Sequence, residues 1–331
     1  MNPFSYSRAD DVAEAVSEVS RVRTAKFIAG GTNLIDLMKE NVARPRHLID
    51  ITHLPLNRIQ DTDEGGLRIG ALVTNSDTAY NPQVEMRYPL LSRAILSGAS
   101  PQLRNMATNG GNLLQRTRCY YFYDMATPCN KRERGTGCSA LEGFNRMHAV
   151  LGASDQCVAV HPSDMSVALL ALDAVVQVRG TDGYRSIPIT DFHRLPGDTP
   201  DIDTNLGADE IILSIDLPPK GFADHHAYLK VRDRTSYAFA LVSVAAALEM
   251  SGSTINDARI ALGGVAHRPW RNKDSEALLH GKPASEENFQ NAADAILKDA
   301  RGLQYNSFKI VLARRAIVRA LKHAAHLEKQ Q

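Results

Sequence analysis

The first fifty residues alternate between helical and strand-like spacing of their apolar positions. Ser7 is placed to cap a first helix, whose apolar face runs from Val12 to Val19. Short strands are expected at 25–29 and 47–51, with a Gly30-Gly31 turn and a helix at 33–40 between them. Strand, glycine turn and helix in this order are typical of an α/β unit.

A second group of elements begins near residue 67, after the turn-forming residues 61–66. Helices are expected at 90–99 and at 164–173, the latter capped by Ser163, and a hairpin at 175–189. Residues 148–153 have strand-like alternation. Between residues 100 and 143 there is little periodicity, which in a compact domain indicates a long functional loop.

The last third of the chain is patterned as strands followed by helices. Consecutive antiparallel strands are expected at 211–217, 227–231, 238–249 and 258–265, and helices at 285–300 and 307–327. This order predicts an α+β domain. We place the three structural units at 1–55, 56–220 and 221–331.

Composition narrows the functional classes. The 331 residues carry 38 Lys plus Arg against 37 Asp plus Glu, so a net charge of +1 gives no general attraction for nucleic acid or anionic membranes. The longest nearly apolar run, 238–248, is shorter than the roughly 20 residues that span a bilayer. We therefore expect neither a membrane anchor nor an export signal in this chain.

Two glycine turns are candidates for binding a diphosphate. FIAGGTNL occupies 27–34 and ATNGGNLLQ occupies 107–115, and backbone N–H groups in such turns can hold phosphate oxygens. Neither turn contains the lysine of a P-loop, which disfavours ATP. The residues alone leave a second interpretation open, in which the glycines only allow the chain to reverse.

The only four cysteines lie close together in sequence, at Cys119, Cys129, Cys138 and Cys157. They include no CxxC pair, so a structural zinc site, two disulfides and a four-thiolate iron–sulfur cluster all remain open. Neighbouring cations would offset thiolate charge. These are Arg116, Arg118, Lys131, Arg132 and Arg134.

Several motifs, in order, resemble the FAD subunits of the xanthine dehydrogenase and carbon monoxide dehydrogenase family, the molybdenum hydroxylases. They are AGGTNL at 29, ATNGGNLLQRTRC at 107, HPSDM at 161, EIILSIDLP at 210 and YLKVRDRTSYAFALVSVA at 228. The cysteine-bearing segment is most similar to the periplasmic aldehyde oxidoreductase branch. The resemblance covers nearly the whole chain.

The resemblance implies a fold and a flavin site. The fold is α+β, with a vanillyl-alcohol-oxidase-like (PCMH-type) FAD-binding domain of two α/β subdomains and a C-terminal α+β domain. The implied FAD-binding residues are Phe27, Ile28, Ala29, Gly30, Gly31, Thr32, Asn33, Leu34, Thr108, Gly111, Asn112, His161, Ser163, Asp164, Ile212 and Lys230. Without the family, Ser163 and Asp164 look like a helix cap, Ile212 like a core residue and Lys230 like an exposed charge.

The resemblance also favours the iron–sulfur interpretation of the cysteines. The aldehyde oxidoreductase branch and the 4-hydroxybenzoyl-CoA reductases carry a 4Fe-4S cluster in a loop like 115–160, so the implied ligands are all four cysteines. The implied function is electron transfer from a small 2Fe-2S subunit and a large molybdenum-cofactor subunit, which oxidises an aldehyde, to an external acceptor. No catalytic side chain is expected in this subunit, because the flavin carries the redox chemistry.

Three alternatives remain at this point. In two of them the chain serves another molybdenum hydroxylase, similar either to 4-hydroxybenzoyl-CoA reductase or to xanthine dehydrogenase. In the third it is a scaffold subunit stabilised by zinc or disulfides. No NAD fingerprint is present. The compartment is expected to be the periplasm, reached by export together with a signal-bearing partner, and otherwise the cytoplasm.

Overall fold

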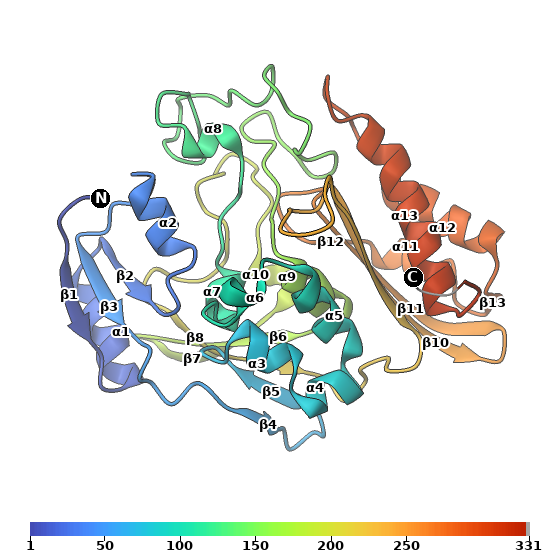
Figure 1. Ribbon diagram of the computed structural model, residues 1–331, viewed down its shortest axis with the longest axis horizontal. Coiled ribbons are helices and arrows are strands. Elements are labelled where there is room, and N and C mark those ends of the chain that lie inside the picture. Colours follow the sequence, from blue (N-terminus) through green and yellow to red (C-terminus); the bar gives the residue numbers. More distant parts are fainter. Residues whose placement is uncertain (329–331) are drawn as a thin grey trace.

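The computed structural model describes residues 1–328 and contains three sheets (Figure 1). The first is a small parallel sheet of order β1-β3-β2, with α1 and α2 beside it. Its elements are β1 (Ser5–Arg8), α1 (Val12–Arg21), β2 (Ala25–Ile28), α2 (Leu34–Lys39) and β3 (His47–Asp50). The predicted apolar face of α1 is confirmed, since Ala15, Val16 and Val19 are buried.

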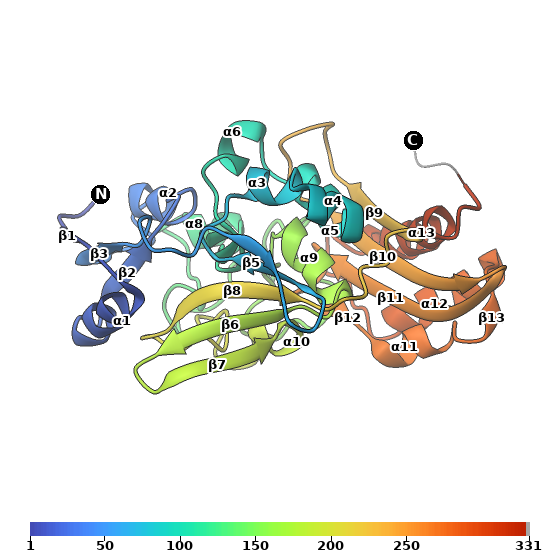
Figure 2. The same ribbon diagram turned by 90° about the horizontal axis from the view of Figure 1, so that it is seen from below.

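The second sheet is antiparallel, of order β4-β5-β8-β6-β7 (Figure 2). Its strands are β4 (Ile59–Asp61), β5 (Leu67–Gly70), β6 (Val175–Gly180), β7 (Gly183–Pro188) and β8 (Ile211–Leu217). The helices of this region are α3 (Asn75–Ala79), α4 (Pro82–Arg87), α5 (Pro89–Ser97), α6 (Pro101–Arg104), α7 (Asn109–Leu113), α8 (Tyr120–Tyr123), α9 (Asp164–Ala171) and α10 (Ile189–Phe192). A large apolar core lies between this sheet and α5 and α9.

The third sheet forms the carboxyl-terminal part, with order β12-β11-β10-β9 and β13 paired to β11. Its elements are β9 (His226–Val231), β10 (Val242–Ser251), β11 (Thr254–Gly263), β12 (Trp270–Arg271), α11 (Lys273–Ala277), β13 (Lys282–Pro283), α12 (Glu286–Leu297) and α13 (Phe308–Ala324). Helices α12 and α13 cover one face of this sheet, and α5 and α9 pack on the other (Figure 2). The α+β class is thus as predicted, and so is the order of two amino-terminal subdomains followed by a carboxyl-terminal domain of sheet and helices.

Several predicted elements are wrong in detail. Ser7 lies in β1, paired with Ile49 of β3, and Asp11 caps α1 instead. Strand β8 lies between β5 and β6 of the second sheet, so it is not a neighbour of β9. Residues 148–153 form no strand, because the amides of Val150 and Leu151 both donate to Val265 O and leave no regular ladder.

The short helices α3, α4 and α6 were missed because they span less than two turns and show no periodicity. Local signals mark them nevertheless. Thr74, Asn81 and Ser100 each cap a helix through the side chain, and proline follows Asn81 and Ser100 directly.

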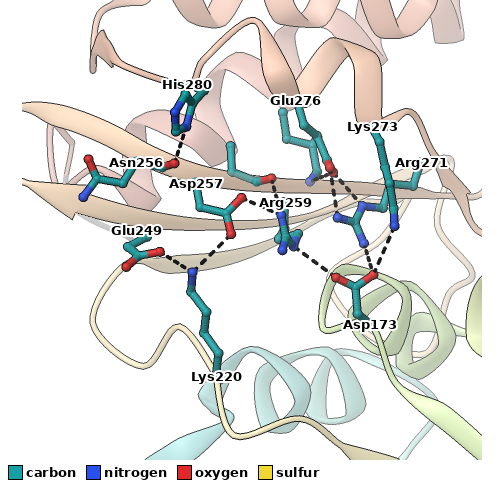
Figure 3. Close-up of polar contacts among 12 residues, drawn as sticks. Asp173, Lys220, Glu249, Asn256, Asp257, Arg259, Arg271, Lys273, Glu276 and His280 are labelled. Atoms are coloured by element: carbon teal, nitrogen blue, oxygen red, sulfur yellow. Dashed lines mark hydrogen bonds and ion pairs between the residues drawn. The ribbon is translucent and has the colours of Figure 1, made fainter.

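A cluster of charged side chains joins the end of α9 to the carboxyl-terminal sheet (Figure 3). Arg271 binds Glu276 with two hydrogen bonds of 2.7 and 2.9 Å, and its Nη1 donates to Asp173 at 2.6 Å and to Leu170 O at 3.0 Å. Arg259 and Asp173 form a second ion pair of 3.2 Å.

Within residues 1–328, no helix is both long enough and apolar enough to cross a membrane.

Replacing Arg271 by methionine is expected to lower the free energy of unfolding by about 3–5 kcal/mol, because Glu276 would keep a buried charge without its partner. The side chains of Arg271 and Glu276 are only 3% and 5% exposed. Denaturation in urea, followed by circular dichroism, measures the change. Arg68→Met is the matched control, since Arg68 binds Asp216 with the same two-bond geometry at 45% exposure and should cost about 0–1 kcal/mol. Equal losses in the two variants would contradict the expectation.

Candidate flavin site and cysteine cavity

The two predicted glycine turns lie against each other. Gly31 has a φ of +71°, and a Cβ atom at Gly30 would overlap Met106 O, just before the second turn. Glycine is therefore required at both positions, for conformation at Gly31 and for close approach at Gly30. At the second turn, Thr108 caps α7 by accepting a hydrogen bond from Gly111 N at 3.3 Å.

Asn33 provides a free donor at this junction. Its Oδ1 accepts a hydrogen bond from Arg116 N at 3.1 Å, whereas its buried Nδ2 has no partner in the described part of the chain. A buried amide without a partner is costly unless a ligand or water satisfies it. The junction of the two turns thus fits a phosphate group, which offers only acceptors.

The second turn also contacts the start of α9. Ser163 Oγ donates to Asn112 Oδ1 at 2.6 Å and accepts from Ser166 N at 3.0 Å, so it caps the helix and binds the turn at once. Asn112 Nδ2 in turn donates to Asn75 Oδ1 at 2.7 Å. His161 is buried beside them, with Nε2 3.2 Å from Ser166 Oγ.

The carboxyl-terminal sheet reaches this region through a buried ion pair. Lys230 Nζ lies 2.7 Å from Asp164 Oδ2, and the two side chains are 5% and 7% exposed. The hydroxyl of Tyr228 donates to Asp164 Oδ1 at 2.6 Å. The interpretation of Lys230 as an exposed strand charge is therefore wrong. Ile212 is a core residue of β8, as its sequence context predicts.

A pocket lies between the second subdomain, the cysteine loop and the carboxyl-terminal sheet, and we call it the larger cavity. His161, Ser163 and Asp164 line one side, and Phe239 and Gly264 line another. Cys119 and His148 complete the wall toward the cysteine loop. The cavity therefore adjoins three of the residues that the resemblance assigns to FAD.

All four cysteines line a second, smaller cavity, the cysteine cavity. Cys129 and Cys138 face each other in an isolated antiparallel bridge, and Cys119 precedes α8. All four are free thiols. Burial raises the pKa of Cys119 to about 12 and of Cys157 to about 11. In residues 1–328, no three His, Cys, Asp or Glu side chains are grouped closely enough to hold a single metal ion.

Among the five cations that surround the cysteines in sequence, Lys131 alone lines this cavity in the described chain. The others are engaged elsewhere: Arg116 binds Asp203, Arg118 binds Asp36, Arg134 binds Asp201, and Arg132 donates to main-chain carbonyls. Of the five suggested cations, only Lys131 is thus placed beside the cysteines in the described chain.

Lys131 belongs to a buried network that the sequence did not reveal. Its Nζ binds Asp203, donates to Pro200 O at 2.8 Å and lies 2.7 Å from His267 Nε2. Burial alone would raise the pKa of Asp203, but Lys131 and Arg116 hold it well below its ordinary value. These residues are far apart in sequence, and no motif marks their association.

The fold and these contacts define the FAD-binding subunits of molybdenum-dependent dehydrogenases, and the chain belongs to this family. The FAD binding domain in molybdopterin dehydrogenase matches residues 2–220, and the CO dehydrogenase flavoprotein C-terminal domain matches residues 226–324.

Individual relatives cover nearly all of the chain. It is 52% identical to the aldehyde oxidoreductase FAD-binding subunit PaoB of Escherichia coli K12, over 98% of this chain and 99% of that protein. It is 28% identical to the carbon monoxide dehydrogenase medium chain of Hydrogenophaga pseudoflava, over 97% and 96% of the two chains. A solved structure of carbon monoxide dehydrogenase from that organism superposes with a TM-score of 0.77 at 28% identity, covering 98% of this chain and 97% of that one.

Gly30→Ala is expected to remove most of the bound flavin, because the added methyl group would push the two glycine turns apart. The ratio of flavin to protein in the purified protein, measured by absorbance, tests this. Gly65→Ala is the control, since a Cβ there meets no atom within 4 Å although φ is +80°. Full flavin content in Gly30→Ala would show that the turns need not touch to bind FAD.

Stability is expected to fall as the pH falls from about 6.5 toward 4. Burial lowers the pKa of both His193 and His267 to about 4, so below pH 6.5 the unfolded chain binds protons that the folded chain does not. Each such histidine contributes a slope of up to about 1.4 kcal/mol per pH unit. The free energy of unfolding, measured by denaturation across this pH range, should change less steeply with pH in His193→Gln than in the unaltered protein.

Proposed function

We propose that this chain is the FAD- and 4Fe-4S-containing electron-transfer subunit of a heterotrimeric, molybdenum-dependent aldehyde oxidoreductase. The observation that carries the proposal is the convergence of all four cysteines on one cavity next to the flavin-binding half. The 52% identity to an aldehyde oxidoreductase subunit over the full length supports the choice of branch.

The residues around the glycine turns are suited to hold FAD. The main-chain amides of the turns and the free Nδ2 of Asn33 would bind the diphosphate, while Thr108, Gly111 and Asn112 close the site from the second subdomain. Ser163, Asp164, His161 and Lys230 would line the path toward the larger cavity. Bound FAD supplies the exchange of electrons, so the protein has only to position it and tune its surroundings.

The donor set of the smaller cavity fits a four-thiolate cluster. In a cubane each thiolate binds a different iron, so the sulfurs stand further apart than the ligands of one ion. This spacing is compatible with four cysteines around a cavity that are not grouped for a single metal ion. Since the pKa values of Cys119 and Cys157 lie far above neutrality, cluster assembly would have to displace their protons.

The proposed partners follow from the relatives, which are medium chains or FAD-binding subunits. A large molybdenum-cofactor subunit would oxidise the aldehyde to a carboxylate, and a small 2Fe-2S subunit would deliver the electrons to this chain. An external acceptor would then receive them. We further propose that the assembled complex works in the periplasm, exported with a signal-bearing partner.

Cys129→Ser is the experiment that separates these assignments. In complex purified without oxygen, the variant should lose most of its iron but keep nearly all of its FAD, because Cys129 lies in the loop rather than in the glycine turns. Iron and zinc analysis and the flavin spectrum provide the readouts. Glu142→Gln, which alters an exposed residue of the same loop outside the cysteine cavity, is the control and should keep both cofactors. Stoichiometric zinc without iron in the unaltered complex would refute the cluster, and equal loss of iron and FAD would refute the separation of the sites.

A further inference from the structure

One side chain lies behind a cysteine on the wall between the two cavities. Cys119 lines both the cysteine cavity and the larger cavity, whereas His148 lines the larger cavity and contacts Cys119 from that side. The distance from His148 Nε2 to Cys119 Sγ is 3.0 Å. Across residues 1–328, no other side chain has a hydrogen bond to a cysteine sulfur.

The state of Cys119 determines which partner donates in the hydrogen bond between His148 and Cys119. His148 is 2% exposed, and its Nδ1 is buried without a hydrogen-bond partner in the described chain. A metal-bound thiolate has lone pairs and no hydrogen, so it only accepts. When Cys119 is a ligand, the hydrogen of this pair must therefore sit on His148 Nε2.

Hydrogen bonds from Asn145 and from the carboxyl-terminal part of the chain hold the main chain of His148 in place. His148 N donates to Asn145 O at 3.0 Å, and His148 O accepts hydrogen bonds from Lys309 Nζ at 2.8 Å and Asn306 Nδ2 at 3.2 Å. Lys309 is fully buried and also donates to Gly264 O at 2.5 Å. The main chain that carries the imidazole is thus fixed by Lys309 of α13, by Asn306 just before that helix and by Asn145.

We propose that His148 tunes the cluster, donating an N–H···S hydrogen bond to the Cys119 thiolate that raises the reduction potential of the iron–sulfur centre. The inference rests on the proposed function, because it needs the cluster. A donor at a ligand sulfur withdraws negative charge, and this favours the form that carries the additional electron. His148 acts through Cys119 and is a positioning residue rather than a catalytic one.

The test compares His148→Leu with His148→Gln in the intact complex prepared without oxygen. Leucine removes the donor, whereas the amide of glutamine can place an N–H near the original Nε2 position. A redox titration followed by electron paramagnetic resonance gives the midpoint potential of the cluster, and iron and FAD are measured on the same samples.

We expect His148→Leu to retain iron. Its redox equilibrium should shift toward the oxidised cluster about tenfold, which corresponds to a midpoint potential lower by about 59 mV for one electron. His148→Gln should restore a potential close to that of the unaltered complex. An unchanged potential in iron-replete His148→Leu would overturn the proposal. So would loss of iron from both variants, since the residue would then serve only to fold the loop. If the unaltered complex contains FAD but no iron, the proposed function itself fails, and this inference with it.

Discussion

The buried ion pair between Asp164 and Lys230 is the contact on which the arrangement of the flavin half and the carboxyl-terminal sheet depends. Two charges at less than 10% exposure are stable only when each is fully hydrogen-bonded. Here Tyr228 donates to the carboxylate, and the ammonium also donates to Ser97 O at 2.9 Å. Because these four groups come from α5, α9 and β9, the pair holds the sheet against the start of α9. The Asp173 cluster secures the other end of that helix (Figure 3).

The cysteine loop is held by polar contacts more than by an apolar core. Only a small group of buried apolar side chains surrounds Phe122, whereas Lys131 contacts Asp203, Pro200 and His267 from distant parts of the chain. Buried polar networks are stabilising only when their members are satisfied together. The loop therefore acquires its shape from the second and third sheets, and a peptide with the loop sequence alone would lack the partners that order it.

The sequence predicted what short-range patterns encode. Hydrophobic periodicity located α1 and the final two helices, because these elements bury one regular face. Helix α9 is buried on every side, and it was located by its Ser163 cap. The β6–β7 hairpin was located by its glycine turn. It misplaced β8, because a strand pattern does not specify which sheet the strand joins. The glycine turns and the cysteines were visible as motifs. Asp203, His267 and His148 were not, because their roles arise from contacts between residues that no local pattern connects.

The geometry around the four cysteines bears on the proposed cluster. Each cysteine is placed by protein contacts: Cys119 by the start of α8, Cys129 and Cys138 by their mutual bridge, and Cys157 by its bridge to Ser154. A site that is ordered in advance loses little conformational entropy when its ligand binds. Zinc fingers behave differently, since they fold only with their metal. The four thiols that the proposed cluster would need are thus ordered by the fold around them, whereas the glycine turns and the buried ion pair of the flavin half lie outside their loop.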